Sequence, residues 1–421
     1  MSGIDGFVIA PKPTAHFGAG SIERLPAIID AIGAEAVVVV TDRALASAPV
    51  VVMVTAMLAE AAMPARVFSG VHPNPSTDDV AAGAAAVAEA AAGAAAVLEA
   101  AAVTATVTAT LRASAPLVAP SAPRGAPIAL VAVGGGSAID AAKGIAIAAV
   151  NPERGRDLDF RHRVKVPALP IVAVPTTAGT GAEASAFGVV TDPVSRRRFY
   201  VGHAGSMPAA TILDPVLTVG LPPEATAAAG MDALTNALES YLSLHPNPWS
   251  DGIALQVIRM IAANLPAAVA DGTDLAARSQ LLLAAHMAGV AMANTGLGLC
   301  HAIGHSLGGR WNIARGVALS MLLPDVLRFN LPVRTQRLAD VSFALGAGHT
   351  GATADRNAAA AIDAIAALRE RVGLTALFAD FGITEADFAQ ITEDALDDEV
   401  LANAPRPPVA SDITALLAAQ S

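Results

Sequence analysis

Asp232 and Asn236 lie one helical turn apart in the stretch GMDALTNALES, residues 230–240. If the stretch is a helix, both side chains share one face, which is the spacing of a pair of metal ligands. Asparagine, however, is a poor ligand for a transition metal. The pair therefore predicts a metal site, a damaged metal site, or a site in which something else has replaced the metal.

His301 and His305 form a second pair one turn apart, in CHAIGHSLGG, residues 300–309. Histidine titrates near neutral pH and often transfers protons, so both residues are candidates for catalysis. The alternative is that each is an interior residue whose ring nitrogens are satisfied. Cys300 directly precedes His301, and adjacent helical residues point apart, so no nucleophile pair is expected there.

A glycine-rich turn follows a predicted strand in VAVGGGSAIDAAK, residues 131–143. Gly134, Gly135 and Gly136 allow a tight turn and a close approach of the backbone to a ligand. Ser137 is expected to cap the following helix, with Asp140 completing a capping box. The N–H groups at the helix start predict a phosphate site, and a purely structural turn is the alternative.

Two further stretches favour a dinucleotide. Asp42 ends the run AEAVVVVTD, where a carboxylate can bind the adenosine ribose hydroxyls and repel a 2′-phosphate. This favours NAD, although Arg43 beside it leaves NADP open, and Asp42 as a helix cap is the alternative. The loop PTTAGTGAEAS (175–185) places the hydroxyls of Thr176 and Thr177 after a strand, where open α/β sheets bind ligands. Its alternative is an ordinary turn.

The elements that position these residues divide the chain into two parts. Continuous apolar runs alternate with helical stretches in the first part, which is typical of parallel strands covered on both faces. The predicted strands are residues 34–42, 64–71, 126–137 and 169–177. The second part is helical, for example residues 250–269 and 278–292, and the Pro and Gly of DPVLTVGLPPE separate the two. We expect an α/β dinucleotide-binding domain over 1–218, with an alanine-rich insertion at about 84–125, and a helical catalytic domain over 219–421.

The insertion begins as a plausible alanine-rich helix and ends as a Ser/Pro/Ala-rich surface loop. Its composition favours a segment without chemistry, and a lid or an oligomer contact is the alternative.

Composition narrows the class of protein. Of the 421 residues, 54% are hydrophobic, but charged residues, Gly and Pro interrupt the apolar runs, so no membrane-spanning helix and no signal peptide are expected. A single cysteine fits a reducing cytoplasm, and a net charge of −11 argues against nucleic-acid binding. We expect a cytoplasmic enzyme with a small-molecule substrate, in the form of a homodimer.

With these motifs taken in order, the chain resembles the iron-containing (group III) alcohol dehydrogenases. The resemblance implies a Rossmann-like N-terminal domain, a helical C-terminal domain, and a cleft between them for a nicotinamide cofactor, substrate and divalent metal. It rests on HPNPSTDDV, GGGSAIDAAKGIA, PTTAGTGAEAS, MPAATILDP, GMDALTNALESYLS, HAIGHSLGG, ARGVALSMLLP and NAPRP. The cofactor residues that it implies are Asp42, Gly135, Gly136, Ser137, Asp140, Thr176, Thr177 and Arg198, the last at a position where the family often has Lys.

The metal of this family is usually held by one Asp and three His. Asp232 and His301 match two of these ligands, whereas Asn236 and Arg315 stand where the other two His are expected. Because a guanidinium is always protonated, Arg315 places a positive charge where the cation would bind. We therefore expect no divalent metal. Arg315 is expected to stabilise a developing alkoxide, to pair with Asp232, or to clamp an anionic group of the substrate.

The resulting prediction is an NAD(P)-dependent oxidoreductase that reduces a carbonyl or an activated alkene by hydride transfer without a metal. The candidate catalytic residues are His305 as first proton donor, His301 as second, and Arg315, Asp232 and Asn236. One alternative is a metal-dependent alcohol dehydrogenase with a weak Asp/Asn/His site. Another is a non-catalytic nucleotide-binding descendant, and a sugar-phosphate cyclase fits the motifs less well.

Overall fold

The computed structural model describes residues 9, 13–110, 128–152 and 157–420, with 95–110 described by their backbone only. A six-stranded parallel sheet forms the N-terminal part. In spatial order its strands are β1 (Thr14–Phe17), β8 (Ala210–Leu213), β5 (Ile171–Pro175), β4 (Ile128–Gly134), β2 (Ala36–Asp42) and β3 (Ala65–Val71). The four predicted strands are confirmed. The short strands β1 and β8 were not predicted.

Both faces of the sheet are covered, which explains the continuous apolar runs. In β2, Val37 and Val39 face one core while Val38 and Val40 face the other, and β4 and β5 alternate in the same way. Helices α1 (Leu25–Ile32) and α2 (Pro49–Glu60) cover the first face, and α3 (Thr77–Thr110) and α4 (Gly136–Ala148) cover the second. The Rossmann-like architecture expected for this part is therefore present.

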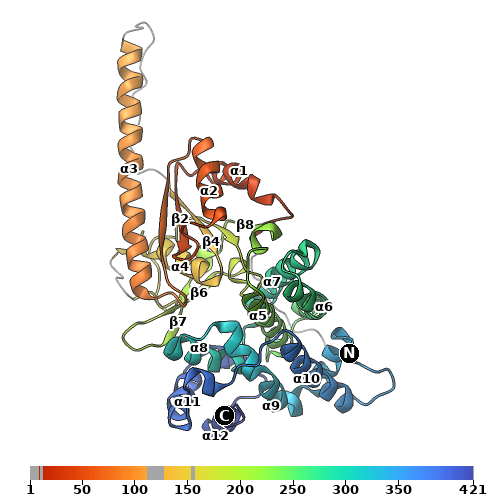
Figure 1. Cartoon of the computed structure of the whole chain (residues 1–421). Coiled ribbons are helices and arrows are strands. Elements are labelled where there is room, and N and C mark those ends of the chain that lie inside the picture. Colours follow the sequence, from red (N-terminus) through yellow and green to blue (C-terminus); the bar gives the residue numbers. More distant parts are fainter. Residues whose placement is uncertain (1–8, 10–12, 111–127, 153–156, 421) are drawn as a thin grey trace.

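Helix α3 contains the alanine-rich segment. It contacts α4, β2 and β3 near its start and then runs as one straight helix past the sheet (Figure 1). The predicted alanine-rich helix is confirmed. The Ser/Pro/Ala-rich end of the insertion, residues 111–125, lies outside the described residues.

An antiparallel hairpin joins the sheet to the helical part. It consists of β6 (Phe187–Thr191) and β7 (Arg198–Gly202), which pack on α4, while β7 also touches α8 (Leu299–Trp311). Arg198 and Tyr200 alternate with Phe199 along β7, so they share one face of the strand. The hairpin therefore carries two polar side chains toward the helical part.

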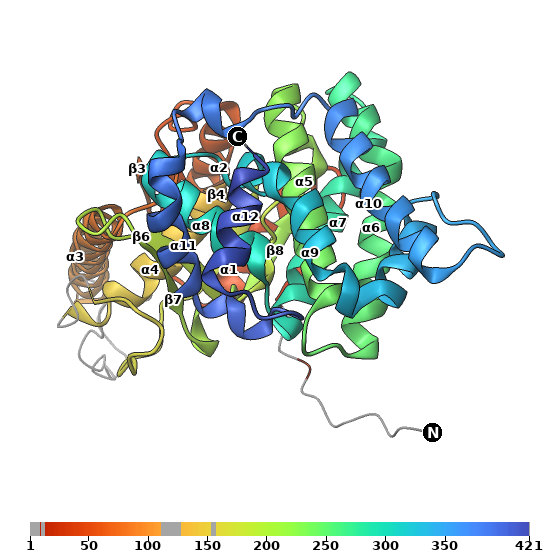
Figure 2. The same ribbon diagram turned by 90° about the horizontal axis from the view of Figure 1, so that it is seen from below.

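After Leu213 the described chain contains no further strand. Besides α8, the helices are α5 (Pro223–Leu242), α6 (Pro248–Ala270), α7 (Leu275–Thr295), α9 (Arg315–Ala344), α10 (Ala354–Arg371), α11 (Phe388–Leu396) and α12 (Ala410–Ala418). Both helices predicted in this part are confirmed as α6 and α7. Figure 2 views the molecule from the side of α9 and α12, with α11 beside them.

Short 3₁₀ helices complete the described chain. They are η1 (Ser21–Arg24), η3 (Ala182–Ala184), η4 (Ala204–Ser206), η5 (Pro215–Thr218), η6 (Phe378–Phe381), η7 (Glu385–Asp387) and η8 (Glu399–Asn403).

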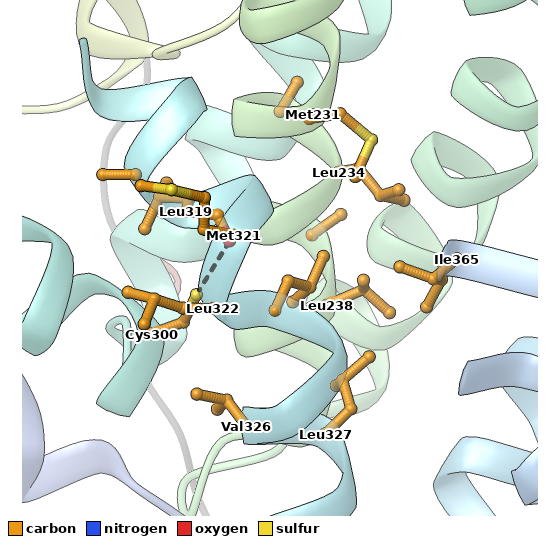
Figure 3. Packing of buried hydrophobic residues seen from close by; sticks show 14 of the residues in the cluster. Met231, Leu234, Leu238, Cys300, Leu319, Met321, Leu322, Val326, Leu327 and Ile365 are labelled. Carbon is orange, nitrogen blue, oxygen red and sulfur yellow. Dashed lines mark hydrogen bonds between the residues drawn. The ribbon is translucent and has the colours of Figure 1, made fainter. Parts of the chain in front are cut away.

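Helix α5 lies at the centre of the helical core, in contact with α6, α7 and α9. Figure 3 shows Leu238 of α5 and Leu322 of α9 in this core. Nearby, the Cys300 thiol donates to the carbonyl oxygen of Leu319 at 3.5 Å (Figure 3), whereas His301 contacts Glu239, so the two side chains have different partners. The apolar packing holds α5, α8 and α9 in fixed positions relative to one another.

Among the described residues, three helices, α6, α7 and α9, are long and apolar enough to cross a membrane by length and composition alone. The expectation that no segment reaches this length was therefore wrong, because alanine-rich helices stay apolar despite scattered Gly and Pro. In this fold α6 and α7 pack on each other and on α5, and α9 packs on α5 and α10.

The start of α9 packs closely on α5 at Gly316. This contact predicts that a larger residue at Gly316 lowers the stability of the protein. A Cβ at Gly316 would overlap the backbone carbonyl of Ala228. Gly316→Ala is expected to destabilise the protein by about 2–3 kcal/mol, because backbone atoms cannot move aside as a flexible side chain can. Urea unfolding measures this, with Gly252→Ala as a control. Gly252 lies in α6 with open space around it, so its substitution should stabilise by about 0.5–1 kcal/mol.

Candidate active site

The glycine turn lies at the carboxyl edge of the sheet, between β4 and α4. Helix α4 begins at Gly136 with Gly135 as its N-cap, and no side chain caps it. The predicted capping box was therefore wrong. The Ser137 hydroxyl instead accepts from the backbone N–H of Asn74 at 3.3 Å. Asp140 is buried with its Oδ1 3.8 Å from the Lys143 ammonium, and burial raises the pKa of Asp140.

The loop after β5 packs tightly on this turn. The N–H of Thr176 donates to the carbonyl of Gly134 at 3.0 Å. A Cβ at Gly135 would lie 3.2 Å from the Thr177 hydroxyl, and one at Gly136 would lie 2.5 Å from Thr180 Cγ2. The fold thus brings the two predicted loops together, with room only for glycine between them.

Asp42 ends β2 beside the same turn. Its Oδ2 is 3.6 Å from the position that a Cβ at Gly134 would take, and its Oδ1 accepts from the N–H of Leu45 at 2.9 Å. Because α2 begins only at Pro49, Asp42 caps the turn after β2 and no helix. A carboxylate therefore lies beside the predicted phosphate site, as expected.

Arg198 reaches the turn from the hairpin. Its Nη2 donates to Oδ1 of Asn74, whose Nδ2 donates to Oδ1 of Asn312 at 2.6 Å. Burial, together with the nearby guanidinium of Arg315, lowers the pKa of Arg198 to about 10. Asn74 was not predicted as a site residue, although it lies in the quoted motif HPNPSTDDV.

At the position implied for the metal, Arg315 pairs with Asp232. The Arg315 Nε lies 2.9 Å from Oδ2 and 3.2 Å from Oδ1 of Asp232, and its Nη2 donates to the carbonyl of Thr180 at 3.3 Å. The Arg315 side chain is 17% exposed and that of Asp232 is 4% exposed. Burial opposes the charge of Arg315, but the Asp232 carboxylate outweighs it and raises the pKa of Arg315.

Asn236 completes this cluster. Its Nδ2 donates to the carbonyls of Gly179 and Thr180 and to Oδ1 of Asp232, at 3.3–3.4 Å. Three acceptors around Nδ2 fix the amide orientation, because a flipped amide would turn its oxygen toward them. Asn236 Oδ1 is consequently buried without a hydrogen-bond partner in the described structure.

The two histidines each donate to a carboxylate. His301 Nδ1 lies 2.6 Å from Oε2 of Glu239, which leaves the His301 Nε2 buried and without a partner among the described residues. His305 Nδ1 lies 2.7 Å from Oδ2 of Asp398, and burial lowers the pKa of His305 against the effect of that carboxylate. The two rings are 5.9 Å apart, centre to centre.

Sequence reasoning missed Glu239 and Asp398. Glu239 lies three residues after Asn236 on the same face of α5, and this spacing was a usable signal. Asp398 directly precedes η8, far along the chain from His305, and no local pattern connects them.

A pocket of about 310 Å³ opens beside these groups. Its lining joins residues from both parts of the chain, including Asp140, Thr180, Tyr200, His305 and Arg315. A larger and more polar hollow of about 480 Å³ adjoins it and shares Tyr200, His305 and Glu399 with it. The smaller pocket is the better candidate for a substrate, because it contains both Arg315 and His305.

Four other residues with polar or aromatic side chains have their contacts outside the smaller pocket. His286 is buried against Glu183, with 3.3 Å between Nδ1 and Oε1. The hydroxyl of Tyr241 donates to Asp340 at 2.9 Å, and Trp311 packs on the helical core. Arg197 forms an exposed ion pair with Asp397. None of these four lines the smaller pocket.

The parallel sheet, the glycine turn at its carboxyl edge and the pocket against a helical part define a two-part dehydrogenase fold. The model of the iron-containing alcohol dehydrogenases matches residues 12–113 and 96–215, and that of the family's C-terminal part matches 226–421. The chain belongs to the iron-containing alcohol dehydrogenase family, and it is accordingly an oxidoreductase.

Individual relatives of known sequence or structure support this family assignment. The "Probable alcohol dehydrogenase EutG" of Escherichia coli is 41% identical over 290 residues, covering 69% of this chain and 72% of its own length. The NAD-dependent methanol dehydrogenase of Bacillus methanolicus is 31% identical over 405 residues, or 96% of this chain and 97% of its own. The crystal structure of a 1,3-propanediol oxidoreductase superimposes with a TM-score of 0.82 at 32% identity, covering 99% of this chain and 100% of that one.

Proposed function

We propose that the chain interconverts small aldehydes or ketones and their alcohols with NAD(H), and that the Arg315 guanidinium occupies the metal's position. The ion pair between Arg315 and Asp232 is the observation that carries this proposal. The names of the relatives support small alcohols and carbonyl compounds as substrates, and one of them names NAD.

The residues around the glycine turn fit the cofactor. The first turn of α4 has no side-chain cap, so its N–H groups and the helix dipole are available to a pyrophosphate. Asp42 is placed to accept from ribose hydroxyls beside Gly134. Thr176 and Thr177 line the approach to the turn. The bound cofactor supplies or accepts the hydride.

The residues at the metal position do not fit a divalent cation. Its only carboxylate, Asp232, already holds a guanidinium, and that positive charge would oppose a metal. Within the described residues, no group of three or more His, Cys, Asp or Glu is arranged to hold a metal ion. We therefore derive no catalytic step through a metal.

Arg315 and His305 provide the chemistry instead. The described residues leave Arg315 Nη1 without a partner, so it can donate to the carbonyl oxygen that becomes negative as hydride arrives. His305 lines the same pocket and is the candidate proton donor to that oxygen, with Asp398 holding its ring. A preorganised donor in a buried site acts on the transition state more than on the ground state.

Spectrophotometric assay of NADH oxidation tests the function, with protein purified without added metal and a panel of short aldehydes. Turnover supports the proposal. Tight NADH binding without turnover of any member of the panel would favour the non-catalytic alternative.

A metal-dependent alcohol dehydrogenase is the second candidate. Asn236 Oδ1 and His301 Nε2 are both buried acceptors without partners in the described chain, and a weakly held cation would satisfy them. This candidate requires Arg315 to leave Asp232, and the metal content of the unmodified protein separates the two.

Cofactor choice gives a direct prediction for Asp42. Asp42→Ser should lower the ratio of kcat/KM for NADH to that for NADPH by about tenfold or more, because a hydrogen bond to a charged group is lost and a 2′-phosphate is no longer repelled. Steady-state kinetics with both cofactors measure the ratio. Asp30→Ser, which removes an exposed carboxylate from α1, is the matched control and should leave the ratio in place.

A further inference from the structure

Tyr200 has a buried hydroxyl that no part of the proposed mechanism uses. Its oxygen has no hydrogen-bond partner in the described structure, although the residue lines both hollows of the site. A buried, unpaired hydroxyl is costly unless a ligand satisfies it. Burial raises the pKa of Tyr200, so the group stays neutral and remains a hydrogen-bond donor.

Arg198 lies on the same face of β7 as Tyr200. Its described hydrogen bond goes to an amide oxygen, that of Asn74, and no described carboxylate lies within ion-pair distance of its guanidinium. Burial and then the charge of Arg315 lower the pKa of Arg198, and the two guanidinium groups line neighbouring hollows that share Tyr200. An unpaired buried cation is unfavourable without an anion.

Four carboxylates that act on Arg198 or Tyr200 are engaged by other residues. Asp140 lies beside the Lys143 ammonium, Asp232 pairs with Arg315, and Asp398 accepts from His305. Glu399 lies 3.2 Å from Arg161. The donors of Tyr200 and Arg198 are therefore left for an acceptor that comes from outside the described chain.

We infer that Tyr200 and Arg198, which both line the larger hollow, form an anion subsite that binds a carboxylate carried by the substrate. This inference rests on the proposed function and names its substrate class as small carbonyl compounds with a carboxylate on the same short chain. A carboxylate has enough lone pairs to accept from both donors, while Arg315 stays with the carbonyl oxygen. The subsite lies where the two hollows meet at Tyr200, so the rest of the substrate extends into the 310 Å³ pocket toward His305.

The pyrophosphate of the cofactor is another source of negative charge near Arg198, since Asn74 links Arg198 to Ser137 of the glycine turn. Equilibrium binding distinguishes the two sources and does not depend on turnover. Isothermal titration calorimetry is carried out with butyrate and with butyramide, which have similar shapes but differ in charge, each with and without saturating NADH.

The subsite predicts that butyrate binds about 10- to 100-fold more tightly than butyramide, and that this preference persists with NADH bound. Tyr200→Phe and Arg198→Met should each reduce the preference by about tenfold. Arg259→Met, which removes an exposed guanidinium from α6, should keep it and controls for net charge.

Three results would overturn the inference. They are equal binding of butyrate and butyramide, loss of the butyrate preference when NADH is bound, and an unchanged preference in both site variants. Because butyrate and butyramide do not react, an inactive protein that prefers butyrate would refute the proposed function and leave the subsite intact.

Discussion

Replacing Arg315 with Met is expected to lower kcat/KM for aldehyde reduction by about 10²- to 10³-fold, the usual loss when one preorganised donor to an oxyanion is removed. The loss should appear mainly in kcat, because the guanidinium donates most strongly to the oxygen that becomes negative in the transition state. Steady-state kinetics at saturating NADH measure it.

This substitution alone would leave the Asp232 carboxylate buried and unpaired, which costs about 3–5 kcal/mol of stability. The decisive comparison is therefore between the double variant Asp232→Asn with Arg315→Met and the single variant Asp232→Asn. The single variant keeps the cation at the site and should lose much less activity than the double variant. Loss of an oxyanion donor should separate the kcat/KM values of the two variants by far more than about threefold. A smaller difference would show that Arg315 does not act on the reacting oxygen.

Placing histidine at Asn236 and Arg315, where the resemblance implies metal ligands, is expected to have the second large effect. The double variant Asn236→His with Arg315→His is expected to bind about one divalent metal per chain, because Asp232, His301 and the two new side chains provide a four-ligand set. Its activity should depend on the added metal and be lost with a chelator. Metal content is measured by inductively coupled plasma mass spectrometry after gel filtration.

The single variants give the internal control for this prediction. Asn236→His leaves Arg315 in place, and its charge should keep the metal out. Arg315→His removes that charge and should allow weak, substoichiometric binding. A double variant that stays free of metal would show that the positions of Asp232 and His301 do not suit a metal for some reason other than the charge of Arg315.

Long, regular elements were predictable from the sequence. Short strands and contacts between distant parts of the chain were not. Strand β2 and helices α6 and α7 follow from long apolar patterns. The four-residue strands β1 and β8 have no such pattern, and β1 pairs with β8 from the far end of the N-terminal part, Thr14 lying opposite Ala210. The capping box failed because Gly135, not Ser137, precedes the first helical residue of α4.

The site was predictable to a similar degree. Helical spacing predicted that Asp232 and Asn236 share one face of a helix. In the structure Asn236 Nδ2 donates to Oδ1 of Asp232 at 3.3 Å. The sequence leaves three possible roles for Arg315, because only the approach of α9 to α5 brings it to Asp232. The sequence does not indicate Tyr200 as a site residue, since a lone aromatic in a hairpin gives no local signal that its hydroxyl is buried.

The measurement that tests the central claim most directly is metal analysis combined with a chelator assay on the unmodified protein. Protein purified without added metal is analysed for Fe, Zn, Mn, Co and Ni, and its NADH-dependent aldehyde reduction is assayed before and after EDTA. If Arg315 occupies the metal's position, as we propose, metal content should be far below stoichiometric and activity should survive the chelator. A stoichiometric metal whose removal abolishes activity, and whose return restores it, would contradict the account.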